Sequence, residues 1–200
     1  MLDRLRVSLE SSLASLGKTA SKVMPNPTAW TMIGLVLAVF SFIFYSAGRP
    51  LVAGLLLAAS GFLDVVDGAV ARATGRTSQR GAFLDSTLDR VSELLVFVGI
   101  LIGRLASPLL VVLALSLSLL VSYARAKGDA LGVSLAGVGI GERSERLVVL
   151  IVASVFRILQ LGVLVVVALA LITFVQRTLA VSKALGRRGP QVLERPPPAP

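Results

Sequence analysis

The chain has 200 residues, of which 55% are hydrophobic, and it contains no cysteine and no histidine. This apolar content is gathered in runs of about 20 residues, which is typical of a polytopic α-helical membrane protein and excludes an ordinary soluble domain. The missing thiols and imidazoles exclude a disulfide framework, a histidine-based triad and the usual zinc sites, so a bound metal ion would need oxygen ligands.

The formal net charge is +9, from 20 lysine and arginine residues against 11 aspartate and glutamate residues. The basic residues cluster at the ends of apolar runs and form no stripe interleaved with aromatic residues. That distribution is typical of the positive-inside rule and of contact with anionic headgroups. We therefore predict membrane lipids as partners and no nucleic acid.

The first 23 residues are predicted to form an amphipathic helix that lies in the membrane interface. Leucines recur at spacings of three and four from Leu2 to Leu16, and Arg4, Lys18 and Lys22 supply polar positions. An apolar stripe beside basic residues, without a continuous apolar run, favours an interfacial helix over a transmembrane span.

Six transmembrane spans are predicted after a break at residues 24–28, which contains two prolines. Their approximate ranges are 28–47, 51–74, 81–103, 108–127, 147–156 and 161–179. A polar, glycine-rich connection, residues 128–145, precedes the fifth and shortest span. We predict one six-helix transmembrane domain over residues 24–185 and a disordered, proline-rich tail over residues 186–200.

The charge distribution indicates how the six spans are oriented. Six spans put both termini on one side, and all lysines and arginines except Arg49, Arg104 and Arg157 fall on that side. The positive-inside rule then predicts that both termini, and the polar junction of the second and third spans, face the cytoplasm. The predicted location is the cell membrane.

Four aspartates gather at that junction: Asp64, Asp67, Asp85 and Asp89. A carboxylate inside a membrane span is costly, so it indicates a functional site by default. Helical spacing puts the first pair on one helix face and the second pair on another. Two Mg²⁺ or Mn²⁺ ions would neutralise these charges and would suit a phosphoryl transfer, with one aspartate as general base for an alcohol.

A cation or proton transporter is the alternative of a different class, because intramembrane carboxylates also mark ion relays. Transporter acids more naturally lie near the bilayer midplane and in two related halves. Here all four lie toward one side, and the sequence has no visible internal repeat. Small residues beside the carboxylates, Gly68, Ala71 and Gly81, would let a ligand approach the backbone closely, which favours a binding site.

The full pattern, D-x2-D-G-x2-A-R-x8-G-x3-D-x3-D, resembles the signature of the CDP-alcohol phosphotransferase family. Its fixed positions are Asp64, Asp67, Gly68, Ala71, Arg72, Gly81, Asp85 and Asp89. The resemblance implies that Asp64, Asp67 and Asp85 hold the metal ions and that Asp89 is both a metal ligand and the base. It also implies a CDP-linked lipid as donor, CMP as leaving group, and a homodimer.

The same resemblance implies which residues contact the CDP-linked lipid, whether CDP-archaeol or CDP-diacylglycerol. The family often opens its first span with a Pro-Asn-x-x-Thr turn, and here Thr28 stands in place of the asparagine. The implied contacts are Thr28, Thr31, Gly68, Ala71, Arg72, Ser78 and Gly81.

Two basic runs, residues 122–127 and 141–146, are similar to those of the branch that makes phosphatidylinositol phosphate or archaetidylinositol phosphate. A phosphorylated acceptor brings a dianion, and arginine forks suit its recognition. The predicted phosphate contacts are Arg125, Arg143, Arg146 and Arg177. We predict a phospholipid synthase with inositol 1-phosphate as acceptor and keep glycerol 3-phosphate as the alternative.

Overall fold

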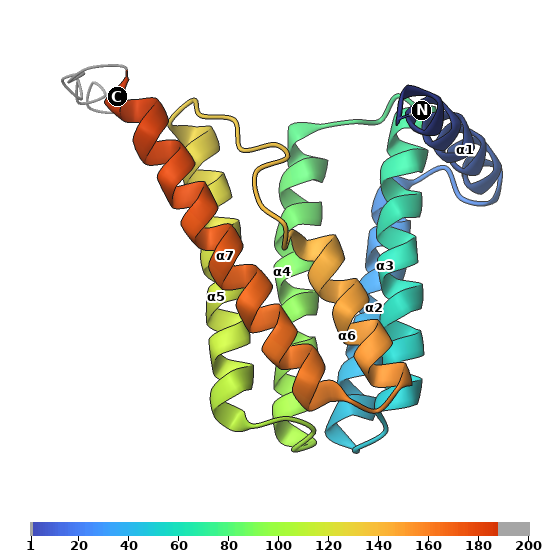
Figure 1. Ribbon diagram of the computed structural model, residues 1–200. Coiled ribbons are helices and arrows are strands. Elements are labelled where there is room, and N and C mark those ends of the chain that lie inside the picture. Colours follow the sequence, from blue (N-terminus) through green and yellow to red (C-terminus); the bar gives the residue numbers. More distant parts are fainter. Residues whose placement is uncertain (1, 188–200) are drawn as a thin grey trace, which may run out of the picture.

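The computed structural model describes residues 2–187, with side chains from residue 13 onward, and this part of the chain is all α-helical (Figure 1). Its seven helices are α1 Leu2–Val23, α2 Pro27–Ser46, α3 Pro50–Ala73, α4 Gln79–Ile102, α5 Pro108–Ala130, α6 Arg143–Val155 and α7 Leu159–Gly186. The predicted leucines Leu2, Leu5 and Leu9 and almost all of the predicted tail therefore lie outside the described side chains.

Proline sets the start of three of the long helices. Pro27, Pro50 and Pro108 each occupy the first turn, where the missing N–H has no partner to lose and the fixed φ already suits a helix. Asn26 caps α2, since its side chain accepts a hydrogen bond from the N–H of Thr28 at 3.1 Å. These local signals explain why the predicted starts of α2, α3 and α5 lie within one residue of the observed ones, whereas α7 continues to Gly186, beyond the predicted end at residue 179.

Four helices, α2, α3, α5 and α7, are long and apolar enough to cross a membrane. An all-α membrane protein is thereby confirmed, while the prediction of six spans is supported for four helices. The helix α4 has 24 residues, but its first half carries charged side chains. The helix α6 has only 13 residues and would extend about 20 Å at 1.5 Å per residue, less than a bilayer core.

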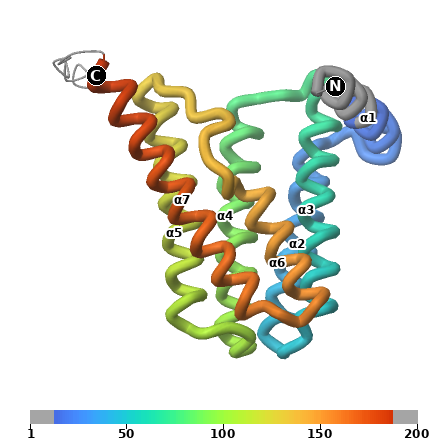
Figure 2. Tube along the Cα trace, in the orientation of Figure 1, coloured from blue at the N-terminus to red at the C-terminus, as the bar shows by residue number. Residues whose placement is uncertain are grey.

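The connection between α5 and α6 differs most from the sequence prediction. α5 continues to Ala130, and residues 131–142 then run down alongside the bundle to the start of α6, partway along α4 (Figure 2). Gly139 and Gly141 allow this descent, because a Cβ at either residue would collide with α7, at Thr173 and Leu169 respectively. The segment predicted as a polar connection is thus partly packed inside the helix bundle.

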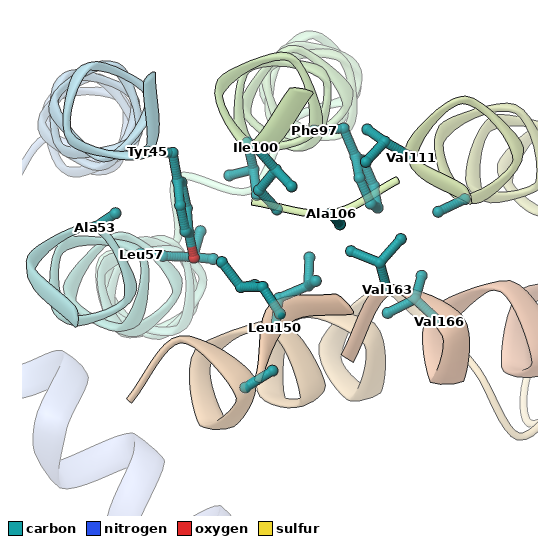
Figure 3. Packing of buried hydrophobic residues seen from close by; sticks show 14 of the residues in the cluster. Tyr45, Ala53, Leu57, Phe97, Ile100, Ala106, Val111, Leu150, Val163 and Val166 are labelled. Atoms are coloured by element: carbon teal, nitrogen blue, oxygen red, sulfur yellow. The ribbon is translucent and has the colours of Figure 1, made fainter. Parts of the chain in front are cut away.

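The apolar core lies in the half of the bundle away from the chain termini (Figure 1), and its side chains pack between the helices (Figure 3). Tyr45 of α2, Leu57 of α3, Phe97 of α4 and Leu150 of α6 are almost fully buried there. The hydroxyl groups of Tyr45 and Ser154 lie 2.6 Å apart, so the one polar group at this end of α6 is satisfied. This core joins α2 to α7 in one half of the bundle and leaves the other half free for polar residues.

The described part of α1 packs against α3. A Cβ at Gly17 would collide with the backbone carbonyl of Ala69, so the two helices approach as closely as glycine permits. Ala20 is buried with Val66 and Val70 in a small separate cluster. The interfacial placement of α1 stays a prediction, but its inner face is occupied by protein rather than lipid.

Candidate active site

The four aspartates lie between the C-terminal half of α3 and the N-terminal half of α4, at the end of the bundle that we predict to face the cytoplasm. Asp64 and Asp67 come from α3, and Asp85 and Asp89 come from α4 after a short turn. Asp67 and Asp85 line a common pocket, and Asp64 and Asp89 are joined through Arg143. The predicted cluster is therefore assembled by the fold, with Asp67 5% exposed and the others partly buried.

Arg143, the first residue of α6, bridges two of these carboxylates. Its Nη1 atom lies 2.8 Å from Asp64 Oδ2 and 2.7 Å from Asp89 Oδ1. Arg90 lies beside Asp89 at 3.4 Å. A guanidinium group therefore supplies the positive charge that the carboxylate pair requires.

Asp67 is held differently, by a neutral group from α2. The Thr31 hydroxyl donates a hydrogen bond to Asp67 Oδ2 at 2.6 Å, and Thr31 also approaches the carbonyl oxygen of Pro27 at 3.3 Å. Both predicted residues are buried at this contact. The start of α2 is thereby fixed against the aspartate cluster.

The donor set of this cluster suits a hard divalent cation. Among the side chains of residues 13–187, no three acidic groups lie close enough together to enclose a metal ion. Asp67 accepts a hydrogen bond from Thr31, and Asp64 and Asp89 both contact Arg143. All ligands are carboxylate oxygens, which Mg²⁺ and Mn²⁺ prefer. The guanidinium of Arg143 lies between the carboxylates of Asp64 and Asp89 and offsets their negative charge. A divalent cation would offset the same charge, so the residues of the cluster fit such an ion.

A pocket of about 230 Å³, which we call the nucleotide-side pocket, opens between the start of α2 and the α3–α4 turn. All the residues predicted to contact the CDP-linked lipid line it, and so do Asp67 and Asp85. Ser78 caps α4 by accepting the N–H of Gly81 at 3.0 Å. Gly68 leaves space in the pocket, because a Cβ there would meet only the Arg72 side chain at 3.5 Å.

A larger cavity of about 740 Å³, which we call the acceptor-side cavity, lies between α4, α5, α6 and α7. Asp85 and Asp89 line it together with all four predicted arginines, Arg125, Arg143, Arg146 and Arg177. Asp85 therefore belongs to both spaces. Two separate pockets that share one carboxylate of the cluster can bring two substrates to the same point.

The four arginines differ in how much hydrogen-bonding capacity remains. Arg125 is exposed to the cavity. Arg177 is 2% exposed and donates to the carbonyl oxygens of Val121 and Val138 and to Glu142 Oε1. Arg146 is likewise buried and paired. The structure thus brings all four arginines together, and each of them except Arg125 is paired with a carboxylate of the protein.

Glu93 and Thr173 contribute to the site and were missed by the sequence analysis. Glu93 is 2% exposed and pairs with Arg146, and the Thr173 hydroxyl accepts the N–H of Gly141 at 2.8 Å. A signal was present for Glu93, because it follows Asp85 and Asp89 at four-residue spacing and is an acid inside an apolar run. No comparable signal marks Thr173.

The chain matches the family model for CDP-alcohol phosphatidyltransferase over residues 24–179. It belongs to this family, and the prediction from the aspartate motif is confirmed. The chain is accordingly a phosphotransferase enzyme, and the alternative of a cation or proton transporter is excluded.

Similar proteins are synthases of inositol-containing phospholipids. The chain is 37% identical over 185 residues to archaetidylinositol phosphate synthase of Pyrococcus horikoshii, covering 92% of this chain and 98% of that protein. It is 40% identical over 161 residues to archaetidylinositol phosphate synthase of Methanothermobacter thermautotrophicus, covering 78% and 82%. Phosphatidylinositol phosphate synthase of Streptomyces avermitilis is 31% identical over 177 residues, covering 79% and 72%.

Solved structures of Mycobacterium tuberculosis phosphatidylinositol phosphate synthase have the same fold. One, with CDP-DAG bound, superimposes with a TM-score of 0.79 at 24% identity and covers 90% of this chain and 98% of that one. Another, in complex with manganese and citrate, gives 0.76 at 25% identity and covers 92% of each.

Proposed function

We propose that the enzyme transfers the phosphatidyl-type group of a CDP-linked lipid to inositol 1-phosphate and releases CMP. The observation that carries this proposal is the meeting of two pockets at Asp85: a small one with glycines and hydroxyls, and a larger one with arginines. A nucleotide suits the first, and a phosphorylated alcohol suits the second. The names of the similar synthases support the same donor and acceptor classes.

The chemistry assigned to the residues follows from which space each one faces. Asp89 lines the acceptor-side cavity, so we assign it the removal of the proton from the attacking hydroxyl. That oxygen forms a bond to the β-phosphorus of the donor, while the bond from this phosphorus to the CMP oxygen breaks. Thr28, Thr31, Gly68, Ala71, Arg72, Ser78 and Gly81 would hold the donor in place.

Two divalent ions, Mg²⁺ or Mn²⁺, would be held by Asp64, Asp67, Asp85 and Asp89. When bound, they would offset the charge of the pyrophosphate and of the departing CMP. A solved relative in complex with manganese supports a divalent ion of this kind. In this chain Thr31 keeps the Asp67 side chain in place, and Arg143 neutralises Asp64 and Asp89.

Recognition of the acceptor phosphate is assigned to the arginine-rich wall of the larger cavity, whose members act by direct contact or by supporting one another: Arg125, Arg143, Arg146 and Arg177. Arg125 is the strongest candidate for direct contact, because it is exposed to the cavity. An acceptor without a phosphate, such as glycerol or serine, would offer Arg125 no anionic partner. Glycerol 3-phosphate remains the alternative, since it carries the same charged group.

The proposed topology has six crossings, with α4 as the third and with α6 plus residues 131–142 as the fifth. The segment 131–142 adds the length that α6 lacks, and the backbone at Gly139 and Gly141 packs against α7. Non-helical backbone at membrane depth requires such protein contacts. The start of α1 and the end of α7 lie at the same end of the bundle (Figure 1). We assign this end, and the two pockets, to the cytoplasmic face of the cell membrane. A homodimer stays a prediction.

An acceptor screen tests the proposal. The purified protein in liposomes, with CDP-archaeol or CDP-diacylglycerol and Mg²⁺ or Mn²⁺, is assayed for CMP release with inositol 1-phosphate, inositol, glycerol 3-phosphate and serine. We expect release with inositol 1-phosphate and little with inositol. Preference for glycerol 3-phosphate would replace the acceptor, and equal use of unphosphorylated alcohols would contradict the role of the arginines.

A further inference from the structure

A buried ion pair joins α4 to α6 one turn below the aspartate cluster. Glu93 Oε1 accepts two hydrogen bonds from Arg146, from Nε at 3.0 Å and from Nη2 at 2.7 Å. The two side chains are 2% and 1% exposed. Such a pair is weak evidence for stability, because the loss of hydration offsets most of the attraction.

The pair is also incompletely satisfied. Glu93 Oε2 is buried and has no hydrogen-bond partner among the residues that the structure describes. A buried acceptor without a partner has lost its hydration and gained no hydrogen bond in return, which lowers the stability of the folded protein. Because an apolar pair of similar size would avoid this cost, the position of the two charges needs an explanation other than stability.

The pair repeats, one turn deeper, the contact between Asp89 and Arg143. Glu93 follows Asp89 by four residues on α4, and Arg146 follows Arg143 by three residues on α6. Each acid–base pair has a closest contact of 2.7 Å. The two helices are thus linked by two successive ion pairs, of which the inner is almost fully buried and the outer is partly exposed in the acceptor-side cavity.

Arg146 also fixes the segment that leads into α6. Its Nη1 atom donates to the carbonyl oxygen of Gly141 at 2.8 Å, while the N–H of Gly141 donates to Thr173. A Cβ at Gly141 would approach Leu169 to 2.8 Å, so this backbone is enclosed by α7 on one side and by Arg146 on the other. The start of α6 is therefore determined by contacts with both α4 and α7.

We propose that Glu93 and Arg146 are positioning residues: their ion pair holds the start of α6 so that Arg143 reaches Asp64, Asp89 and the acceptor phosphate. This inference rests on the proposed function for the identity of the acceptor. It assigns to Arg146 an indirect role, because three of its donor atoms are committed to Glu93 and Gly141. Neither residue touches the reacting atoms.

The test removes the pair without leaving a buried charge. In the double variant Glu93→Met with Arg146→Met, apolar side chains of similar size replace both ions, which is often neutral for stability. Arg146→Lys keeps the charge but loses the fork that joins Glu93 to Gly141. Tyr45→Phe is the matched control, because it removes a buried polar contact at the other end of α6 and leaves Ser154 bonded to Leu150.

The kinetic readout separates positioning from folding. We expect the double variant to raise the KM for inositol 1-phosphate by roughly tenfold or more, since displacing a binding group by about 1 Å costs up to two orders of magnitude. The KM for the CDP-linked lipid should stay within about twofold, because the nucleotide-side pocket is lined by α2, α3, the α3–α4 turn and the start of α4, and by no residue of α6. Arg146→Lys should be intermediate, and Tyr45→Phe should change neither KM.

A second readout does not depend on activity. The chain has no cysteine, so Ser144→Cys gives a single site for a nitroxide label at the start of α6, on the wall of the cavity. We expect the label to be more mobile in the double variant and in Arg146→Lys than in the parent or in Tyr45→Phe. If the double variant does not fold, the acceptor KM and the label mobility are both measured on Arg146→Lys.

The outcomes distinguish the two proposals. An unchanged acceptor KM together with unchanged label mobility in a folded variant would overturn the positioning role. Absence of turnover with inositol 1-phosphate in the parent protein would overturn the proposed acceptor instead, while the label mobility still decides whether the pair positions α6.

Discussion

The two pockets that share Asp85 are built from different kinds of sequence. The nucleotide-side pocket takes its lining from residues 27–31 and 67–85, where glycines, alanine and hydroxyl groups leave space for a ligand. The acceptor-side cavity collects long charged side chains from α4, α5, α6 and α7. The first is a compact motif that can be recognised along the chain, and the second exists only after folding.

The largest expected effect concerns the carboxylate cluster on which both pockets depend. Asp89→Asn should lower kcat by about a thousandfold, within the range that positioned general bases contribute. The amide cannot take the hydroxyl proton, but its shape is unchanged, so thermal unfolding should show a folded protein. CMP release at saturating substrates is the measurement.

A matched control is Asp129→Asn, which also changes an acid on the wall of the acceptor-side cavity but lies outside the cluster. Its kcat should remain within about twofold of the parent, as for a surface substitution. Normal turnover in Asp89→Asn would mean that another residue is the base.

The second prediction affects the acceptor alone. Arg125→Ala should raise the KM for inositol 1-phosphate by roughly ten- to a hundredfold, the value of one charge-assisted hydrogen bond of about 1.5–3 kcal/mol. The KM for the CDP-linked lipid should not change, because Arg125 does not line the nucleotide-side pocket. Initial rates with each substrate varied in turn give both constants.

Lys127→Ala is the control for this variant, since Lys127 is an exposed cation two residues further along α5 and outside the cavity lining. It should leave both KM values close to the parent. Equal rises in the two constants for Arg125→Ala would indicate a general electrostatic effect rather than an acceptor contact.

The third prediction affects binding of the CDP-linked lipid and not binding of the acceptor. Gly68→Ala places a methyl group in the smaller pocket, where it meets only the Arg72 side chain at 3.5 Å. Alanine favours a helix interior by about 1 kcal/mol over glycine, so the variant should be at least as stable as the parent. The KM for the CDP-linked lipid should nevertheless rise, with no change for the acceptor.

Thermal unfolding and the two KM values check this prediction together. A stable variant with poorer donor binding would show that Gly68 is required for space and not for folding. A donor KM equal to that of the parent would mean that the donor does not approach this part of α3.

The contrast between the pockets also explains which features the sequence could predict. Helix boundaries followed from apolar runs and from Pro27, Pro50 and Pro108, because these signals act locally. The nucleotide-side residues followed from a motif with fixed spacing. In both cases the information lies within one or two helices.

The acceptor side depends on tertiary contacts that no local pattern specifies. The bridge from Arg143 to Asp64 joins residues far apart in the chain, and so does the pair of Glu93 with Arg146. The descent of residues 131–142 depends on the close fit of Gly139 against Thr173. A glycine-rich segment indicates freedom of the backbone, but it does not indicate where that backbone packs.

The smallest expected effect concerns Thr28, which stands where the resemblance leads one to expect asparagine. Thr28 is exposed at the edge of the nucleotide-side pocket, whereas Thr31, one turn further, is buried and bonded to Asp67. Thr28→Ala should therefore change the donor KM by no more than about threefold, as expected for an exposed contact that water can replace.

Thr31→Val is the companion variant, because it keeps the shape of the side chain and removes only the hydroxyl. It leaves buried Asp67 without its hydrogen bond, so it should weaken donor binding and lower stability by roughly 1–3 kcal/mol. If Thr28→Ala were the more harmful of the two, the nucleotide would depend on the exposed edge of the pocket, and the start of α2 would bind it through Thr28 rather than position Asp67 through Thr31.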